Sequence, residues 1–258
     1  MSMATVARQN TKTRQGTKWR RDDLLLPVNQ SLVFVHWEAG YGVRRSAFEW
    51  VDLINSDVLA ETVDTDKKPV RIGKATPNGT PAIRFDGTDD RVRLASFTRV
   101  SAEQDVDWWI VCKRNATGAA QRIFEFDGAN VRTLLSSDDS DNVRALIEGN
   151  VGLNQEFEDN ATLMDAWRMY KFEVYPSSGS SEAMGYYDSA LTRFDTLGTQ
   201  SNNTDATQGS GELSVGEHIS ATGGSNFSGD IALIAATDPA AVADSEIASK
   251  FVELYGVP

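Results

Sequence analysis

The chain has 258 residues, a formal net charge of −12, 40% apolar residues and one cysteine, Cys112. This length suits one large β domain or two small ones, and a single cysteine excludes an intrachain disulfide. No run of residues approaches the roughly 18 apolar positions that a membrane helix needs. The N-terminal residues lack the apolar core of a secretory signal, so we expect a protein kept in a reducing environment and no membrane partner.

Residues 1–28 are polar and basic without sustained periodicity, which predicts an extended N-terminal arm. Residues 1–21 carry six cations and no acid, so this part has a charge of +6 and the rest of the chain −18. An acidic body repels nucleic acid, which argues against nucleic acid as its partner. We interpret the arm as an anchor on neighbouring proteins, through Arg8, Lys12, Arg14, Lys18, Trp19, Arg20 and Arg21.

From residue 31 onward, short runs rich in β-branched and aromatic residues alternate with turn residues, which predicts β-strands. Residues 106–113 are almost continuously apolar, as in a strand buried on both faces, and Cys112 within them is expected to be an inert, buried thiol. Residues 167–175 alternate between two faces. The other predicted strands are 31–37, 50–53, 81–85, 91–94, 123–126, 131–135, 143–147, 183–188, 213–216 and 230–236.

Residues 198–211 consist almost entirely of Gly, Ser, Thr, Asn and Gln, which predicts a long surface loop. Residues 244–254 then predict one helix, because Ile247, Phe251 and Leu254 recur at helical spacing and Gly256 ends the pattern. Short strands followed by one terminal helix indicate an all-β sandwich, and we assign residues 29–258 to this single domain.

Three segments, in this order, resemble the concanavalin A-like or laminin G-like jelly-roll superfamily. The first, residues 81–92, resembles the F-D-G-x-D-D opening of these domains. The second, residues 167–174 with 185–189, resembles their Trp-led strand followed by a strand that ends in Y-x-D. The third, residues 227–234 with 244–247, resembles their F-x-G-x-I strand and S-x-x-E-I helix. Ser189 stands where the second motif has glycine. The resemblance implies a sandwich of two antiparallel sheets. Residues 50–81 resemble the leading segment of such domains in bacteriophage virion proteins.

Catalytic chemistry finds little support in the sequence. Glycan hydrolases of this superfamily place paired carboxylates on one strand. The nearest match, Glu125-Phe126-Asp127, lacks the third carboxylate, and we interpret it as a solvent-facing glutamate beside a turn aspartate. His36 and His218 are the only histidines, which excludes a histidine metal cluster and leaves little from which to build a Ser-His-Asp triad. We therefore predict no catalytic residue and no enzymatic activity.

Two other kinds of site are candidates. Asp86, Asp89 and Asp90 share one turn, and converging carboxylates are what Ca²⁺ prefers, although a solvated acidic turn is the alternative. No other cofactor is expected. Exposed aromatic side chains would serve glycan binding, with a place in the core as the alternative. The candidates for glycan contact are Trp37, Tyr41, Tyr186 and Tyr187.

The bacteriophage resemblance and the absence of a catalytic pattern lead to a prediction of function. We predict a non-enzymatic structural protein of the virion, as a capsid decoration (cement) or fibre component. Its arm would bind capsid or other virion proteins, and a homo-oligomer is expected. The first alternative is a carbohydrate-binding adhesin on the virion surface or tail, and the second is a glycan hydrolase.

Overall fold

A computed structural model gives the fold of the chain. It describes residues 33–39, 43–44, 48–55, 57–60, 65–101, 104–115, 117–128, 131–137, 143–149, 165–175, 180–186, 193–201, 209–219, 225–240 and 244–257. The predicted arm, residues 1–28, lies outside these residues, so its boundary and its anchoring role stay predictions.

Sheet A contains eight strands in the order β14-β13-β12-β8-β16-β6-β5, and β1 also pairs with β16. All pairings in it are antiparallel. Its strands are β1 (Val33–Glu38), β5 (Val70–Ile72), β6 (Ala82–Asp86), β8 (Val106–Arg114), β12 (Trp167–Tyr175), β13 (Ser180–Tyr186), β14 (Arg193–Ser201) and β16 (Ser228–Thr237).

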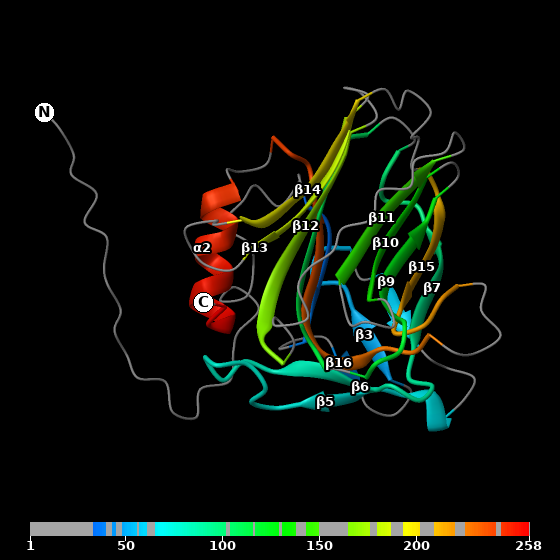
Figure 1. Cartoon of the computed structure of the whole chain (residues 1–258). Helices are drawn as coiled ribbons and strands as arrows, with labels where there is room; N and C mark the ends of the chain where they lie inside the picture. The colour runs from blue at the N-terminus through cyan, green and yellow to red at the C-terminus, as the bar shows by residue number, and fades with distance from the viewer. Residues whose placement is uncertain are drawn as a thin grey trace, which may run out of the picture.

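Sheet B also contains eight antiparallel strands, in the order β11-β10-β9-β15-β7-β4-β3-β2. Its strands are β2 (Val43–Arg44), β3 (Glu49–Val51), β4 (Val58–Ala60), β7 (Val92–Phe97), β9 (Gln121–Asp127), β10 (Val131–Ser137), β11 (Val143–Gly149) and β15 (Gly211–Val215). A short 3₁₀ helix, η2 (Thr65–Lys67), precedes β5. The two sheets face each other in Figure 1, and the predicted all-β sandwich of two antiparallel sheets is confirmed.

The main core lies between the two sheets and is rich in aromatic residues. Trp108 of β8 has its ring centroid 5.0 Å from that of Phe124 and 5.6 Å from that of Phe126. Phe97 meets Phe126 edge-on at 5.5 Å. Such pairs add about 0.5–1.5 kcal/mol each beyond the burial of their area. Alternation along the strands places these side chains inward, so the sequence pattern and the core agree.

A second core lies on the other face of sheet A, beneath helix α2 (Asp244–Tyr255). Figure 1 shows this helix beside sheet A, on the side away from sheet B. Trp109 of β8 packs edge-on against Phe251 at 5.8 Å. Because α2 covers one face and sheet B the other, β8 is apolar on both faces, as predicted. Among the described helices, none is long and apolar enough to cross a membrane.

The predicted elements agree with the structure except in two places. The predicted loop 198–211 overlaps β14, which continues to Ser201, so that part of the prediction is wrong. Strands β2, β4 and β5 were not predicted, because each has only two or three residues, and the nine-residue strand β14 was not predicted either. Cys112 is buried as predicted, and burial raises the pKa of its thiol to about 12.

Candidate functional site

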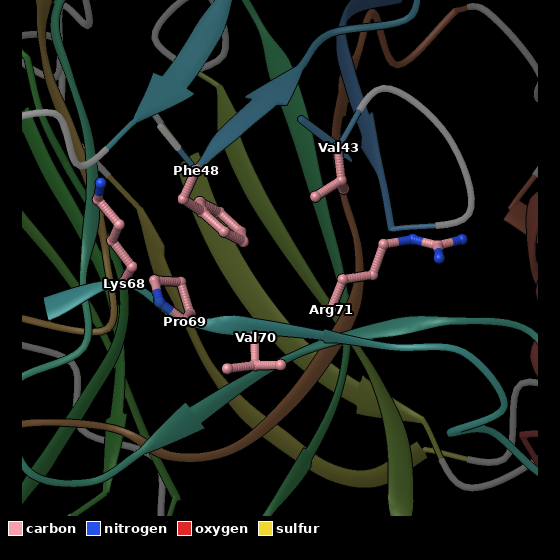
Figure 2. A pocket seen from close by; sticks show the side chains of 6 residues that line it. All are labelled: Val43, Phe48, Lys68, Pro69, Val70 and Arg71. Atoms are coloured by element: carbon pink, nitrogen blue, oxygen red, sulfur yellow. The ribbon is translucent and has the colours of Figure 1, made fainter. Parts of the chain in front are cut away.

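An open pocket of about 300 Å³ lies where the edge of sheet A faces the end of sheet B (Figure 2). We call it the β5 pocket, and it is lined by Val43, Phe48, Lys68, Pro69, Val70 and Arg71. Val43 belongs to β2 and Phe48 directly precedes β3, whereas the other four residues lead into or form β5. The pocket therefore joins residues from both sheets at the margin of the sandwich.

Strand β5 forms this margin because it pairs on one side only. Val70 pairs with Arg84 and Arg71 with Ile83 of β6, and β5 is the last strand of sheet A. Successive side chains of a strand point to opposite faces. Figure 2 shows Arg71 on the same side of β5 as Phe48, with Val70 on the opposite side. Val70 is 59% exposed, and no other large apolar side chain among the described residues is exposed.

The floor of the β5 pocket is apolar. Phe48 is 4% exposed and belongs to the main core, and Val43 packs against the same core. Phe48 has a φ of +20°, which is uncommon for a residue with a side chain. In Figure 2 its ring points toward β5. A hydrophobic floor with a few polar groups is the usual character of small-molecule sites.

Two cations border this floor, and none of the six lining residues is an acid. In the described part of the chain, no carboxylate pairs with the half-buried Lys68. The Arg71 Nε donates a hydrogen bond to the Ala39 carbonyl at 2.8 Å, which orients its guanidinium. The Arg91 amide donates to the Lys67 carbonyl at 3.2 Å and holds the segment that enters β5.

The predicted calcium residues come together in the turn between β6 and β7. One carboxylate oxygen from each of Asp86, Asp89 and Asp90 lies within 4.8 Å of the others. Asp90 Oδ2 accepts a hydrogen bond from the Asp86 amide at 2.8 Å. Burial raises the pKa of Asp90 to about 6, with the neighbouring carboxylates adding to the rise. Three converging carboxylates suit a hard cation, and calcium here stays a prediction.

A network of paired charges covers the outer face of sheet B. Glu125 of β9 accepts a hydrogen bond from Arg132 Nε at 2.7 Å and one from the Ile219 amide at 3.1 Å. Its side chain is only 2% exposed, so the prediction of a solvent-facing glutamate is wrong. The segment that follows β15 folds over Glu125 and buries it, which the pattern of β9 alone does not reveal.

His218 belongs to the same network. Its Nε2 lies 2.6 Å from Arg132 Nη2, and because a guanidinium only donates, Nε2 accepts and the ring is neutral. Burial lowers the pKa of His218, helped by the cations of Arg132 and Arg122 and opposed by Glu125. Glu217, which precedes His218 in the chain, accepts hydrogen bonds from Arg91 at 2.7 Å and Arg93 at 3.2 Å. We refer to these interacting residues as the outer-face network.

A third charged cluster lies on sheet A beside α2. The Lys171 Nζ lies 2.7 Å from Glu173 Oε1, 3.1 Å from Asp107 Oδ2 and 5.2 Å from the centre of the Trp109 ring. Burial raises the pKa of Asp107 to about 6, although Lys171 opposes this effect. Lys171 and Asp107 are almost fully buried, so this cluster satisfies itself and offers no opening to a ligand.

Of the four predicted glycan-contact residues, the structure describes the side chain of Trp37 alone. Trp37 has no exposed surface, lies in the main core and donates its indole N–H to the Asp57 carbonyl at 3.3 Å, so it offers no face to a sugar. Tyr41 and Tyr187 lie outside the described residues, as do all the anchoring residues of the arm. Tyr186 belongs to β13, and its side chain is outside what the structure describes.

The sequence contains one local indication of the β5 pocket that was not among the predictions. Residues 67–71 read Lys-Lys-Pro-Val-Arg, a basic run in an otherwise acidic body. Proline before a short strand is typical of an edge, because proline cannot donate to a neighbouring strand. The contribution of Phe48 and Val43 has no such local signal, because they reach the pocket only through the packing of the two sheets.

No family model matches this sequence, and no curated protein is similar to it. Solved structures do match the fold. A Trypanosoma rangeli sialidase has a TM-score of 0.58 at 9% identity, covering 86% of this chain and 33% of that one. The same sialidase in complex with sialic acid has a TM-score of 0.58 at 10% identity, covering 90% and 36%. The SAP-like pentraxin from Limulus polyphemus has a TM-score of 0.45 at 14% identity, covering 65% and 79%.

The similarity to the sialidase agrees with the observed fold, a β-sandwich of two antiparallel sheets. At such low identity it shows the fold alone, and this chain spans about a third of the length of the sialidases that it matches. The predicted structural role in a bacteriophage virion is contradicted, because the fold matches sialidases and no finding supports a virion role. The predicted β-sandwich is therefore confirmed, and the bacteriophage type of the predicted resemblance has no support.

Proposed function

We propose that this chain is a non-catalytic, saccharide-binding β-sandwich whose ligand binds in the β5 pocket. The observation that carries the proposal is the pocket itself, an opening of about 300 Å³ with an apolar floor and polar side chains at its border. This volume is at the lower end of the range for small-molecule sites, which suits a ligand of about one or two sugar rings.

The chemistry of the border supports the recognition of a sugar. Phe48 and Val43 offer apolar surface to the C–H groups of a sugar ring, and Lys68 and Arg71 offer N–H donors to its oxygens. The sialidases with the same fold act on or bind sialic acid derivatives, which makes saccharides the first ligands to test. This likeness supports the proposal, but the pocket is the main evidence for it.

Binding without cleavage is the second part of the proposal. Most glycoside hydrolases use two carboxyl groups on either side of the scissile bond, about 5–9.5 Å apart, whereas sialidases use a tyrosine as the nucleophile. Among the described residues, none that lines the β5 pocket has a carboxyl group. Glu125, the glutamate of the hydrolase-like sequence pattern, is buried in the outer-face network and already accepts hydrogen bonds from Arg132 and Ile219.

A glycan array followed by titration calorimetry of the retained sugars tests this proposal. Val43→Phe fills the pocket, and we expect it to weaken binding by at least about tenfold, since each lost 1.4 kcal/mol is a factor of ten. Val252→Phe makes the same change at a half-buried valine of α2 and is expected to leave binding unchanged. Circular dichroism checks that both variants keep the β fold.

Two results would overturn the proposal. If the array retains no saccharide, the chain does not bind sugars of the classes it displays. If Val43→Phe and Val252→Phe bind as tightly as the native chain, the ligand binds elsewhere. Release of reducing sugar on long incubation with a retained glycan would contradict the non-catalytic part alone.

A further inference from the structure

His36 of β1 is a buried titratable residue that the proposed saccharide site does not use. Its neighbour Trp37 points into the main core, so alternation along β1 places His36 on the opposite face of sheet A. On that face, Glu38 accepts a hydrogen bond from the hydroxyl of Tyr255 in α2. Ala235 of β16, which is aligned with His36, belongs to the core beneath α2. His36 therefore lies on the face of sheet A that α2 covers.

The imidazole of His36 is enclosed without a polar partner. The residue has no exposed surface, and within the described part of the chain neither ring nitrogen has a hydrogen-bond partner. Its backbone is fixed, because the His36 amide donates to Asp52 Oδ1 at 2.7 Å and its carbonyl accepts from the Leu53 amide at 2.9 Å. Both nitrogens of an imidazolium are donors, so the charged ring needs water or acceptors that this environment does not provide.

The charged and titratable groups around His36 are engaged with other partners. Glu38 accepts from Tyr255, and both oxygens of Asp52 accept backbone amides. Further along the same face, the Lys171 ammonium lies between two carboxylates. The groups in question are Glu38, Asp52 and Tyr255 beside His36, then Asp107, Lys171 and Glu173 along sheet A, and Glu246, Lys250 and Glu253 on α2.

Opening of α2 is a small movement that lets water reach this face. The helix lies outside sheet A, whereas the main core lies between the two sheets (Figure 1). Separation of α2 from sheet A therefore leaves the main core and the strand pairings in place. Local opening of one outer element costs less free energy than global unfolding.

A few specific contacts keep α2 closed. Phe251 packs edge-on against Trp109 at 5.8 Å. The Asn78 side-chain amide donates to the carbonyls of Val252 at 3.0 Å and Glu253 at 2.8 Å, and so satisfies the last turn of the helix. Asn78 does not titrate, so this part of the closure is independent of pH.

We infer that α2 is an acid-sensitive cover of sheet A, which opens as the pH falls because the opened form hydrates and protonates His36. Both sheets stay paired in the opened form. The apolar face that α2 leaves includes Trp109, Val111 and Leu233.

The direction of the effect follows from proton uptake. In the closed form, burial lowers the pKa of His36 to about 3, whereas a hydrated histidine has a pKa near 6.5. Opening therefore takes up a proton between these two values, and the opening constant rises about tenfold for each pH unit below 6.5. The raised pKa of Asp107, about 6, acts in the opposite direction if opening also hydrates this carboxyl. That contribution is common to the native chain and to variants of His36.

Amide hydrogen exchange of the full chain, measured by NMR between pH 7 and pH 4.5 and corrected for intrinsic exchange rates, tests the inference. We expect the opening constant of the α2 amides, divided by that of His36→Leu, to rise roughly 50-fold over this range. At every pH it is expected to exceed the opening constant of the β9 and β15 amides by at least about tenfold, because those amides need global unfolding. His36→Met repeats the comparison if the leucine variant does not fold.

Asn78→Ala is the matched control. It removes the hydrogen bonds to the end of α2 without changing a titratable group. We expect it to raise the α2 opening constant about two- to tenfold by the same factor at every pH. The control thus loosens the helix and leaves the pH dependence to His36.

Three results would overturn the inference. If the α2 amides share one opening constant with β9 and β15, acid acts through global unfolding and not through the helix. If the apolar variants of His36 keep the native pH dependence, another group is responsible. If residues 52–55 gain exchange in acid while α2 stays protected, water reaches His36 from the other side.

None of these results bears on saccharide binding in the β5 pocket, which lies apart from α2 in the structure.

Discussion

The β5 pocket and the outer-face network both contain several charged side chains, but they differ in how these charges are satisfied. In the outer-face network, Glu125 and Glu217 are almost fully buried, and each accepts hydrogen bonds from an arginine of the same sheet. In the β5 pocket, Lys68 has no acidic partner in the described chain, and an opening lies beside it. The ion pairs of the outer-face network stabilise the fold, whereas a lysine beside an open pocket can interact with a bound ligand.

This difference predicts a separation of stability from binding. Substitutions in the outer-face network are expected to change the free energy of unfolding and leave saccharide affinity unchanged. Substitutions at Lys68 are expected to do the opposite. Each prediction below tests one side of this separation.

The largest effect on stability is expected from Glu125→Ala. Removing one partner of a buried ion pair leaves an uncompensated charge, and we expect a loss of about 3 kcal/mol in unfolding free energy by urea titration. Glu212→Ala is the matched control. Glu212 lies 3.7 Å from Arg93 and is 31% exposed, so its loss is expected to cost about 0–1 kcal/mol. Equal losses in the two variants would contradict the distinction between buried and surface pairs.

A second prediction concerns the pH dependence of stability. His36 is fully buried, neither ring nitrogen has a hydrogen-bond partner, and burial lowers its pKa to about 3. The unfolded chain binds a proton at its ordinary pKa near 6.5, so the folded state loses about 1.4 kcal/mol per pH unit below that value. The stability is fully present above pH 6.5 and is lost progressively toward pH 3.

His36→Leu removes this titration, and we expect a flatter profile of unfolding free energy between pH 7 and pH 4. His218→Asn is the companion variant in the outer-face network. The lowered pKa of His218 acts in the same direction, with a smaller effect because its side chain is partly exposed. A profile of native steepness in both single variants and in the double variant would show that other groups cause the acid sensitivity.

A smaller effect of opposite sign is expected at Asp90. Its raised pKa, about 6, means that the folded state binds the proton more tightly than the unfolded chain does. Stability therefore falls as pH rises from about 4 to 6, and Asp90→Asn is expected to raise the melting temperature slightly at pH 7.5 and not at pH 3.5. Asparagine retains an oxygen to accept the hydrogen bond from the Asp86 amide.

Calcium offers a second measurement on the same pair of proteins. If calcium binds Asp86, Asp89 and Asp90, added calcium raises the melting temperature of the native chain and not that of Asp90→Asn. If calcium changes the melting temperature of both proteins equally, the calcium prediction is wrong and the pH prediction is unaffected.

The smallest effect on stability is expected at Lys68. Lys68→Gln removes no ion pair within the described chain, so its unfolding free energy is expected to stay within about 0.5 kcal/mol of the native value. The same variant is expected to weaken saccharide binding in the β5 pocket. A large loss of stability would place Lys68 with the structural charges and would contradict the contrast between the two regions.

The sequence predicted the elements whose signals are local. The run from Val106 to Lys113 indicated a strand buried on both faces, and the structure shows one face against sheet B and the other under α2. The spacing of Ile247, Phe251 and Leu254 predicted α2, which ends at Tyr255 before Gly256 with its φ of +65°. Period and burial are encoded in neighbouring residues, so a sequence pattern reveals them.

The candidate site depended on contacts between distant residues. The β5 pocket joins Val43 and Phe48 to Lys68 and Arg71, and β5 lies at an edge only because it pairs with β6 and no further strand follows. The burial of Glu125 likewise depends on His218 and Ile219, which lie more than 90 residues further along the chain. The sequence by itself therefore determined the β class, the helix and the contrast in charge between residues 1–21 and the rest of the chain. Only the tertiary structure decided which charges are paired and which border an opening, because strand order and sheet packing bring together residues that no local period connects.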